Sequence, residues 1–308
     1  MMTKPSYSRL VKAIENEWGT QHLSDSAVHK AAKEIGALFK DSGVAIFFYG
    51  SCLRSQVYED QVLDFYVIVD SYKKAYTSVW MRVLNALIPP NVFYHETLCE
   101  GVVVRSKYAV ISKNDFKKRC SKNHLNSAIW ARFSQPVFPV FLKDKTVTEN
   151  LAHDVANAVY AMVCESISML PLDQRTGQEV WLNAFSLCYQ AELRSEGAER
   201  AEELYEADPA RYDTMASLVQ TLMDGSSYSK DTIKGKVRWF FRRVNGKSMS
   251  LLRLMKASLT FKGGLDYLAW KIKRHSGVDI EITPWMRKHQ FLGGIKAYVS
   301  LWGKGVIR

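Results

Sequence analysis

The order of apolar and polar positions near the start of the chain predicts a helix followed by two buried strands. In residues 26–42, Ala, Ile and Leu recur every three to four positions, as on one face of a helix, and Gly43 then ends the pattern. Residues 44–49 (VAIFFY) and 61–69 (QVLDFYVIV) are short apolar runs rich in β-branched and aromatic residues. Such runs are typical of strands inside a sheet.

Further apolar segments continue this sheet. A helix is predicted over residues 75–87, and the pair Pro89-Pro90 ends it. Shorter strands are predicted near residues 91–96, 101–105, 107–112 and 137–142. A strand, a helix and then several strands indicate a mixed sheet with helices packed on it. We therefore expect an α/β (α+β) fold over residues 1–146.

The pattern changes at about residue 147. Helices are predicted over residues 150–168, 176–195 and 209–223. The acidic residues 196–208 are interpreted as solvated helix surface, and residues 223–230 (MDGSSYSK) as a hinge. The chain is thus predicted to continue with a helical domain, residues 147–230, and a C-terminal segment, residues 231–308.

The positive charge of the chain is concentrated in that C-terminal segment. The 308 residues carry a net charge of +11. Residues 234–308 contain 17 Lys and Arg against 3 Asp and Glu, whereas the rest of the chain contains 25 against 28. A segment with this excess attracts phosphate, whether on nucleic acid, on an anionic membrane surface or on a phosphorylated substrate.

Two further compositional features narrow the class of protein. The five cysteines are widely spaced and form no C-x-x-C pair, so we expect buried free thiols rather than a disulfide framework or a zinc site. No run of about 18 uncharged apolar residues predicts a membrane span, and the first residues, MMTKPSYSRLVKAIENEW, lack the apolar core of a secretory signal. We expect a cytoplasmic protein.

The stretch FFYGSCLRSQVYEDQVLDFYVIVD carries the candidate chemistry. Gly50 and Ser51 end the first strand; such a turn lets the backbone approach an anion at a helix N-terminus. Asp64 lies in an apolar strand, where a carboxylate is costly unless it is paired or metal-bound. Nucleotidyltransferases of the polymerase-β type combine this turn with metal-binding acids on the next strand. The alternative is an ordinary turn with Asp64 at the surface, and a metal would need another acid, such as Asp60, Asp70 or a distant one.

Several stretches recur in the order seen in one known family. They are YGS and DFYVIVD (residues 49–51 and 64–70), KYAVIS (107–112), WARFSQPV (130–137), LCYQAELR (187–194) and SLLRLMKASLTFKGG (250–264). Together they resemble the mitochondrial-type phosphatidate cytidylyltransferases, the translocator-assembly-and-maintenance family. Ala109 and Ala131 stand where that family has glycine, and Glu192 stands where it has aspartate.

The resemblance implies a polymerase-β-like nucleotidyltransferase that transfers CMP from CTP to phosphatidic acid. The products would be pyrophosphate and CDP-diacylglycerol, a precursor in phospholipid biosynthesis. The residues it implies are Asp64, Lys107 and Arg132 for catalysis; Tyr49, Gly50, Ser51, Lys107 and Arg132 for the nucleotide; Asp64 with Glu192 or Asp70 for Mg²⁺ or another divalent cation; and Arg194, Arg253, Lys256 and Lys262 for the lipid phosphate.

With a lipid acceptor, the basic segment 231–308 is interpreted as a membrane-docking element. Leu251, Met255 and Leu259 recur at four-residue spacing among cations, and interfacial aromatic residues follow. The alternative is that this stripe packs on the rest of the protein. The expected partners are CTP, phosphatidic acid and the anionic inner face of a membrane, without nucleic acid; the oligomeric state is left open.

The sequence is also compatible with two other functions. One is a nucleotidyltransferase that acts on RNA or on a soluble phosphate acceptor, with the basic segment tracking a nucleic-acid backbone. The other is a non-catalytic basic binding module built on the same fold.

Overall fold

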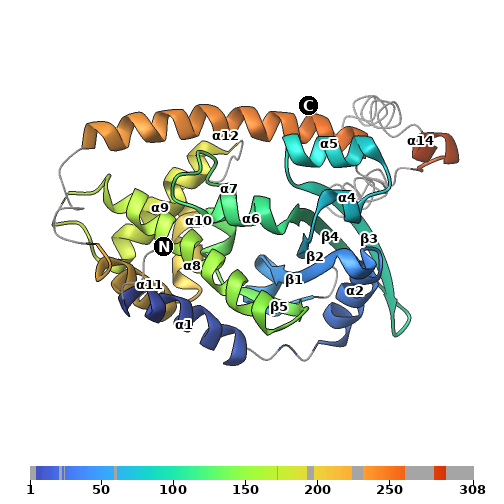
Figure 1. The fold of residues 1–308 in the computed structure, drawn as a ribbon, viewed down its shortest axis with the longest axis horizontal. Helices are drawn as coiled ribbons and strands as arrows, with labels where there is room; N and C mark the ends of the chain where they lie inside the picture. Colours follow the sequence, from blue (N-terminus) through green and yellow to red (C-terminus); the bar gives the residue numbers. More distant parts are fainter. Residues whose placement is uncertain are drawn as a thin grey trace.

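The computed structural model describes residues 5–20, 23, 25–58, 61–171, 173–192, 198–223, 232–260 and 281–288 (Figure 1). Its elements, in chain order, are α1 Pro5–Thr20, α2 Ser26–Ala37, η1 Lys40–Ser42, β1 Gly43–Tyr49, α3 Ser51–Ser55, β2 Val62–Val69, α4 Tyr72–Ala75, α5 Val79–Leu87, β3 Asn91–Cys99, β4 Val102–Ser112, α6 Lys113–Cys120, α7 Ala128–Phe133, β5 Val137–Leu142, α8 Lys145–Ile167, α9 Gly177–Ala191, α10 Ala198–Glu206, α11 Pro209–Gln220, α12 Thr232–Thr260 and α14 Pro284–Lys288.

The strands form one five-stranded mixed sheet in the order β3-β4-β2-β1-β5. β2 and β4 run parallel, and the other three neighbouring pairs are antiparallel. A parallel pair needs a long crossover, and α4, α5 and β3 supply it between β2 and β4. The predicted mixed α/β fold class is confirmed.

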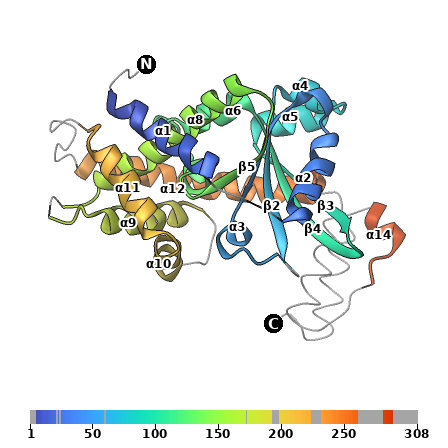
Figure 2. The same ribbon diagram turned by 90° about the horizontal axis from the view of Figure 1, so that it is seen from below.

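Both faces of the sheet are covered. On β2, Phe65 and Val67 belong to a core cluster with α2, whereas Tyr66 and Ile68 belong to a larger cluster with the helices on the other side (Figure 2). Successive side chains of a strand point to opposite faces. A strand buried on both faces is therefore apolar at nearly every position, which explains the continuous run that predicted it.

The helices that follow the sheet share its core. α8 packs against α1, α6, α7 and α9, and its buried side chains belong to the same cluster as Phe47 and Tyr66 of the sheet. The predicted boundary at residue 147 therefore does not separate two hydrophobic cores. These helices cover one face of the sheet, and α7 and α9 both contribute to the core on that face.

Several elements differ from the sequence-based expectation, α6 and α7 among them, since no helix was predicted at either place. The strands predicted near 101–105 and 107–112 are one continuous strand, β4, because Ser106 is fully buried and pairs with His95 of β3. α1 was not among the predicted elements. Its buried side chains Leu10, Ile14 and Trp18 have helical spacing and pack into the larger core.

Two compositional expectations can be compared with the structure. All five cysteines are free and buried, as expected. None of the helices in the described ranges combines the length and the apolar character that a membrane span requires.

Candidate functional site

The Gly50 turn and Asp64 are in direct contact. β1 and β2 are antiparallel neighbours, and Tyr49 at the end of β1 pairs with Asp64 near the start of β2. Gly50 has φ +92°, and a Cβ built there would lie 3.2 Å from Asp64 Oδ2. Ser51 follows as the exposed first residue of α3. A residue other than glycine would strain the turn and press on the carboxylate.

Lys107 reaches the same carboxylate from the third strand. β4 runs parallel to β2, and Lys107 is the register partner of Asp64. Lys107 Nζ lies 3.1 Å from Asp64 Oδ1. Asp64 Oδ1 is buried. Within the described part of the chain, it contacts Lys107 through this ion pair and receives no well-directed hydrogen bond. An under-satisfied carboxylate oxygen next to a partly exposed lysine is suited to a further cationic or phosphate-linked ligand.

Arg132 on α7 forms the next part of the site. Its Nη1 lies 3.1 Å from Glu192 Oε1, directly after α9, and also donates to the Ala128 carbonyl oxygen at 2.7 Å. Burial disfavours the charge of Arg132, but Glu192, Tyr66 and Tyr49 outweigh burial and raise its pKa above the ordinary value. Arg132 is thus a firmly charged group held on the same sheet face as Asp64.

Arg253 of α12 brings a second guanidinium to this region. It donates to the Pro89 carbonyl oxygen at 3.0 Å and to Asn126 Oδ1 at 3.4 Å. Burial, together with the charges of Arg132 and Arg119, lowers the pKa of Arg253 to about 10, although Tyr66 and Glu192 act in the opposite direction. The arginines repel one another and share a few electronegative neighbours.

Arg119 of α6 is a member of this group that the sequence analysis did not identify. Burial lowers its pKa, and Asp115, Tyr72 and Tyr66 partly offset that effect. No hydrogen bond or ion pair joins its side chain to another residue of the described chain. Arg119 lies in a helix with several other basic residues, and the sequence does not distinguish a partly buried cation from solvated ones. Its position could therefore be recognised only from the fold.

We call Arg119, Arg132 and Arg253 the arginine cluster. All three lie near Tyr66 of β2, whose side chain lies on the same strand face as Asp64. Two carboxylates stand beside the cluster, Glu192 at Arg132 and Asp115 near Arg119. The cluster has more positive than negative charge in a partly buried place, an arrangement that a phosphate dianion would neutralise.

Two other predicted residues have different places. Lys256 is buried, and its Nζ donates to the carbonyl oxygens of Ile88 and Pro90, the latter at 2.6 Å. It joins α12 to the α5–β3 connection and does not face lipid, so this prediction is corrected. Arg194 and Lys262 lie outside the described residues.

Asp70 is not a partner for Asp64 at one metal. It follows the far end of β2, six residues or about 20 Å of strand from Asp64. Hydrogen bonds from Lys113 and Lys74, at 2.5 and 2.6 Å, lower its pKa to about 2. The strand geometry therefore overturns the suggestion that both acids bind one cation.

The metal-binding capacity of the site is limited to a few acids. In the described ranges no group of three or more His, Cys, Asp or Glu side chains is placed to hold an ion, and Asp60 lies outside those ranges. Glu192 is engaged by Arg132. Mg²⁺ commonly binds through one or two carboxylates together with substrate phosphates and water. The unsatisfied Asp64 Oδ1 fits this mode and does not fit an all-protein metal cage.

A cavity of about 240 Å³ adjoins α3. Its lining includes Arg54, Phe138, Asp208 and Tyr212. Arg54 follows Ser51 by one turn of α3 and donates to Gln135 Oε1 at 3.0 Å. Burial lowers the pKa of Arg54, with a smaller contribution from Arg200. The cavity therefore combines the aromatic ring of Phe138 with the Arg54 cation, one turn of α3 from Gly50.

Comparison with known proteins gives little beyond this geometry. No protein-family model matches the chain, and no curated protein matches it. Among solved structures, a nucleotidyltransferase-like protein from Exiguobacterium sibiricum 255-15 is similar at 12% identity and a TM-score of 0.28, over 91% of this chain and 93% of that chain. A TM-score this low supports no functional inference.

Proposed function

We propose that this protein is a nucleotidyltransferase that transfers CMP from CTP to phosphatidic acid, forming CDP-diacylglycerol and releasing pyrophosphate. The observation that carries the proposal is the contact between Asp64, the Gly50 turn and Lys107, from three different strands or turns, next to the arginine cluster. These are the residues on which the family resemblance rests, and they are distant in sequence.

The chemistry of this acceptor suits the groups present. A phosphate monoester is largely dianionic at neutral pH because its second pKa is about 6, so it needs no strong general base. Catalysis then depends on alignment and on neutralising charge. Lys107 and Arg132 are proposed to hold the triphosphate. Mg²⁺, when bound at Asp64, would supply further neutralisation of the phosphate oxygens.

The remaining groups are proposed to bind the two substrates at different places in the site. Arg119 and Arg253 would hold the phosphate of the lipid, since they stand on the α6 and α12 side of Tyr66 and, among the described residues, have no carboxylate at hydrogen-bond distance. The nucleoside would occupy the cavity beside α3, where Phe138 offers an aromatic surface and Arg54 a cation.

A single assay tests the reaction class. CTP-dependent release of pyrophosphate would be measured with phosphatidic acid vesicles, with RNA, or with a soluble phosphate monoester as acceptor. Release that requires phosphatidic acid supports the proposal. Release with RNA or the soluble acceptor alone points to the other nucleotidyltransferase function, and no release with any acceptor points to a binding module.

The role of Asp64 is tested by Asp64→Asn, with Asp70→Asn as a matched control on the same strand. Loss of the Asp64 charge should reduce pyrophosphate release by about two orders of magnitude or more, because charge stabilisation in the transition state is lost. Asp70→Asn should retain most activity, since Asp70 lies at the far end of β2. Circular dichroism would check that both variants fold. Equal activity of the two variants would place the reaction elsewhere.

A further inference from the structure

α12 has an inward face that fixes it to the protein. Glu165 of α8 is buried; Arg238 and Arg242 approach its carboxylate at 2.6 and 3.4 Å, and Trp239 Nε1 donates to its backbone oxygen at 3.2 Å. At Gly246, a Cβ would lie 2.1 Å from the Ala191 carbonyl oxygen, so the backbones of α12 and α9 touch. This face accounts for the packing of the helix.

α12 also has a second, outward apolar face. Its exposed large apolar side chains are Ile233, Val237, Phe240, Phe241, Val244, Leu251 and Leu252. At about 100° per residue these positions fall within an arc of about 120°, opposite the inward residues. Phe240 and Phe241 are 57% and 55% exposed. A surface helix needs one apolar stripe to pack on its own protein, so a second stripe indicates a second apolar partner.

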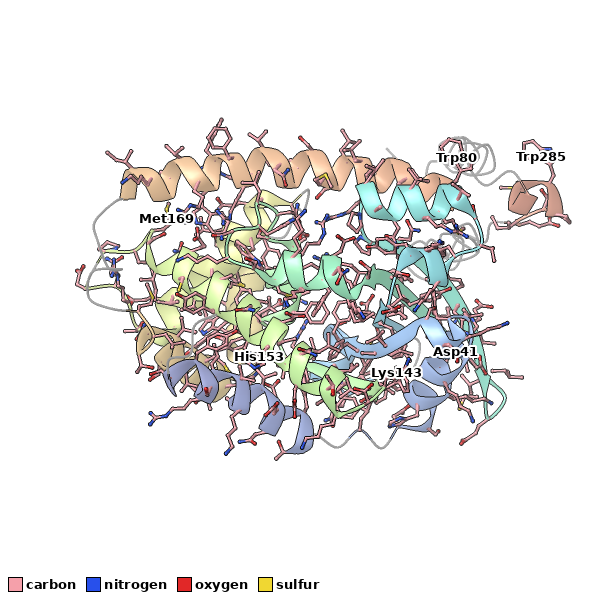
Figure 3. The ribbon with its side chains drawn as sticks, in the orientation of Figure 1. Asp41, Trp80, Lys143, His153, Met169 and Trp285 are labelled. Carbon is pink, nitrogen blue, oxygen red and sulfur yellow. The ribbon has the colours of Figure 1, made fainter. Side chains whose placement is uncertain are left out.

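α5 extends this apolar face. It exposes Val79, Trp80, Val83 and Leu87, and Trp80 is 76% exposed. The end of α5 is joined to α12 by hydrogen bonds from Arg253 and Lys256 to the carbonyl oxygens of residues 88–90. Figures 1 and 3 show α12, α5 and Trp80 along one edge of the molecule. The two helices therefore lie along the same edge of the molecule, and each exposes apolar side chains to solvent.

Cations border the outward stripe of α12. The same helical geometry places Lys236, Arg243 and Lys247 on one flank of the stripe and Lys234 on the other, where the exposed Arg238 also stands although its guanidinium is paired with Glu165. Acidic residues are absent from residues 232–260 of the sequence. An apolar stripe between two rows of cations matches the interface of an anionic bilayer, where each nearby cation adds about 1 kcal/mol of attraction.

We propose that the outward face of α12 together with the exposed face of α5 is a docking surface for an anionic lipid bilayer. The proposal rests on the proposed lipid acceptor and differs from the sequence-based expectation, which placed docking in the C-terminal segment alone and gave α5 no part in it. The proposed docking surface also places the lipid substrate relative to the arginine cluster. Leu252 on the outward side adjoins Arg253 of the arginine cluster, so a docked bilayer would lie about one helix diameter, roughly 10 Å, from that cluster.

Vesicle binding without CTP tests the surface independently of catalysis. The full chain would be co-sedimented with vesicles of phosphatidylcholine alone or mixed with phosphatidylglycerol. The test variant is Trp80→Glu with Phe240→Glu. The matched control is Leu98→Glu with Val102→Glu, since these exposed apolar residues lie on the β3–β4 hairpin. The wild-type chain and the control should bind the anionic vesicles, and the test variant should bind at least about tenfold more weakly.

Other outcomes would overturn this docking surface. One is a test variant that binds vesicles as tightly as the control; another is a wild-type chain that ignores anionic vesicles. Sedimentation velocity tests whether a second copy of the chain occupies the surface instead. If the wild-type chain is a dimer and the test variant is a monomer, the surface would be assigned to self-association. Normal vesicle binding without pyrophosphate release under any condition would reject the proposed function and leave the docking surface standing.

Discussion

At the scale of single residues, contact between the Gly50 turn and Asp64 follows from strand pairing. An antiparallel β1–β2 pair brings residues fourteen apart side by side, and the parallel β2–β4 pair then adds Lys107. The sequence pattern could predict the first contact because both strands are strongly apolar. It could not predict Arg119, whose importance depends on α6, α7 and α12 meeting around Tyr66.

The Gly50 contact predicts a specific loss of activity. Gly50→Ala and the control Gly101→Ala both place a side chain at positive φ, +92° and +83°, which costs about 1–2 kcal/mol. A Cβ at Gly101 meets nothing within 4 Å, whereas one at Gly50 meets Asp64. Urea unfolding should therefore show similar destabilisation for both, while CTP turnover falls in Gly50→Ala alone. Equal turnover would argue against a functional contact.

Arg119 is predicted to act on the acceptor rather than on the nucleotide. Arg119→Ala should raise the KM for phosphatidic acid about tenfold to a hundredfold, because a charge-assisted hydrogen bond to phosphate contributes about 1.5–3 kcal/mol. The KM for CTP should change little. Lys118→Ala, an exposed neighbour on α6, is the control and should leave both values unchanged. A rise in the KM for CTP instead would move Arg119 to the triphosphate.

At the scale of elements, the described half of the C-terminal segment is a long helix packed on the protein. α12 contacts α9 and β3, so its inward face follows the alternative in which this segment packs on the rest of the protein. The expected stripe at Leu251, Met255 and Leu259 is exposed at Leu251, and the side chains of the other two residues lie outside the described ones. Periodicity indicated an amphipathic helix but not that α12 carries an exposed apolar face in addition to its packed one.

The packing of α12 on α9 can be tested by adding one methyl group. Gly246→Ala would place a Cβ 2.1 Å from the Ala191 carbonyl oxygen, so the helices must separate, at a cost of about 1–3 kcal/mol. Gly19→Ala on α1 is the control, because its Cβ meets nothing within 4 Å. That change should be neutral or stabilising by up to about 1 kcal/mol. Urea midpoints would show the difference, and equal midpoints would contradict the close helix contact.

At the scale of the whole molecule, one core joins the sheet to the helical layer and encloses several charged groups. Glu165 is paired with cations, but Asp154 of α8 is buried near Tyr7 and Cys120, with Lys117 as the nearby cation that favours its ionised form. Burial raises the pKa of Asp154 to about 7. The folded protein therefore holds a proton there between about pH 4 and pH 7 that the unfolded chain releases.

This proton links stability to pH. Where the folded state binds more protons than the unfolded state, stability falls as pH rises. Asp154→Asn removes the ionisable group. It should change the unfolding free energy little at pH 4 and increase it by about 2–4 kcal/mol at pH 8, since one unit of pKa corresponds to about 1.4 kcal/mol. Urea unfolding across this range is the measurement. A difference that stays constant with pH would contradict a proton held at Asp154.

The sequence by itself determined the mixed sheet, the helices α2, α5, α8, α9 and α11, and the pairing of a glycine turn with Asp64. These features depend on apolar periodicity and on neighbouring strands, which are local properties of the chain. Only the tertiary structure decided that Lys256 binds carbonyl oxygens and that Arg119 joins Arg132 and Arg253. Those outcomes depend on where helices that are distant in sequence pack. The sequence of a charged residue and its neighbours does not show whether its side chain is solvated or lies in a binding site.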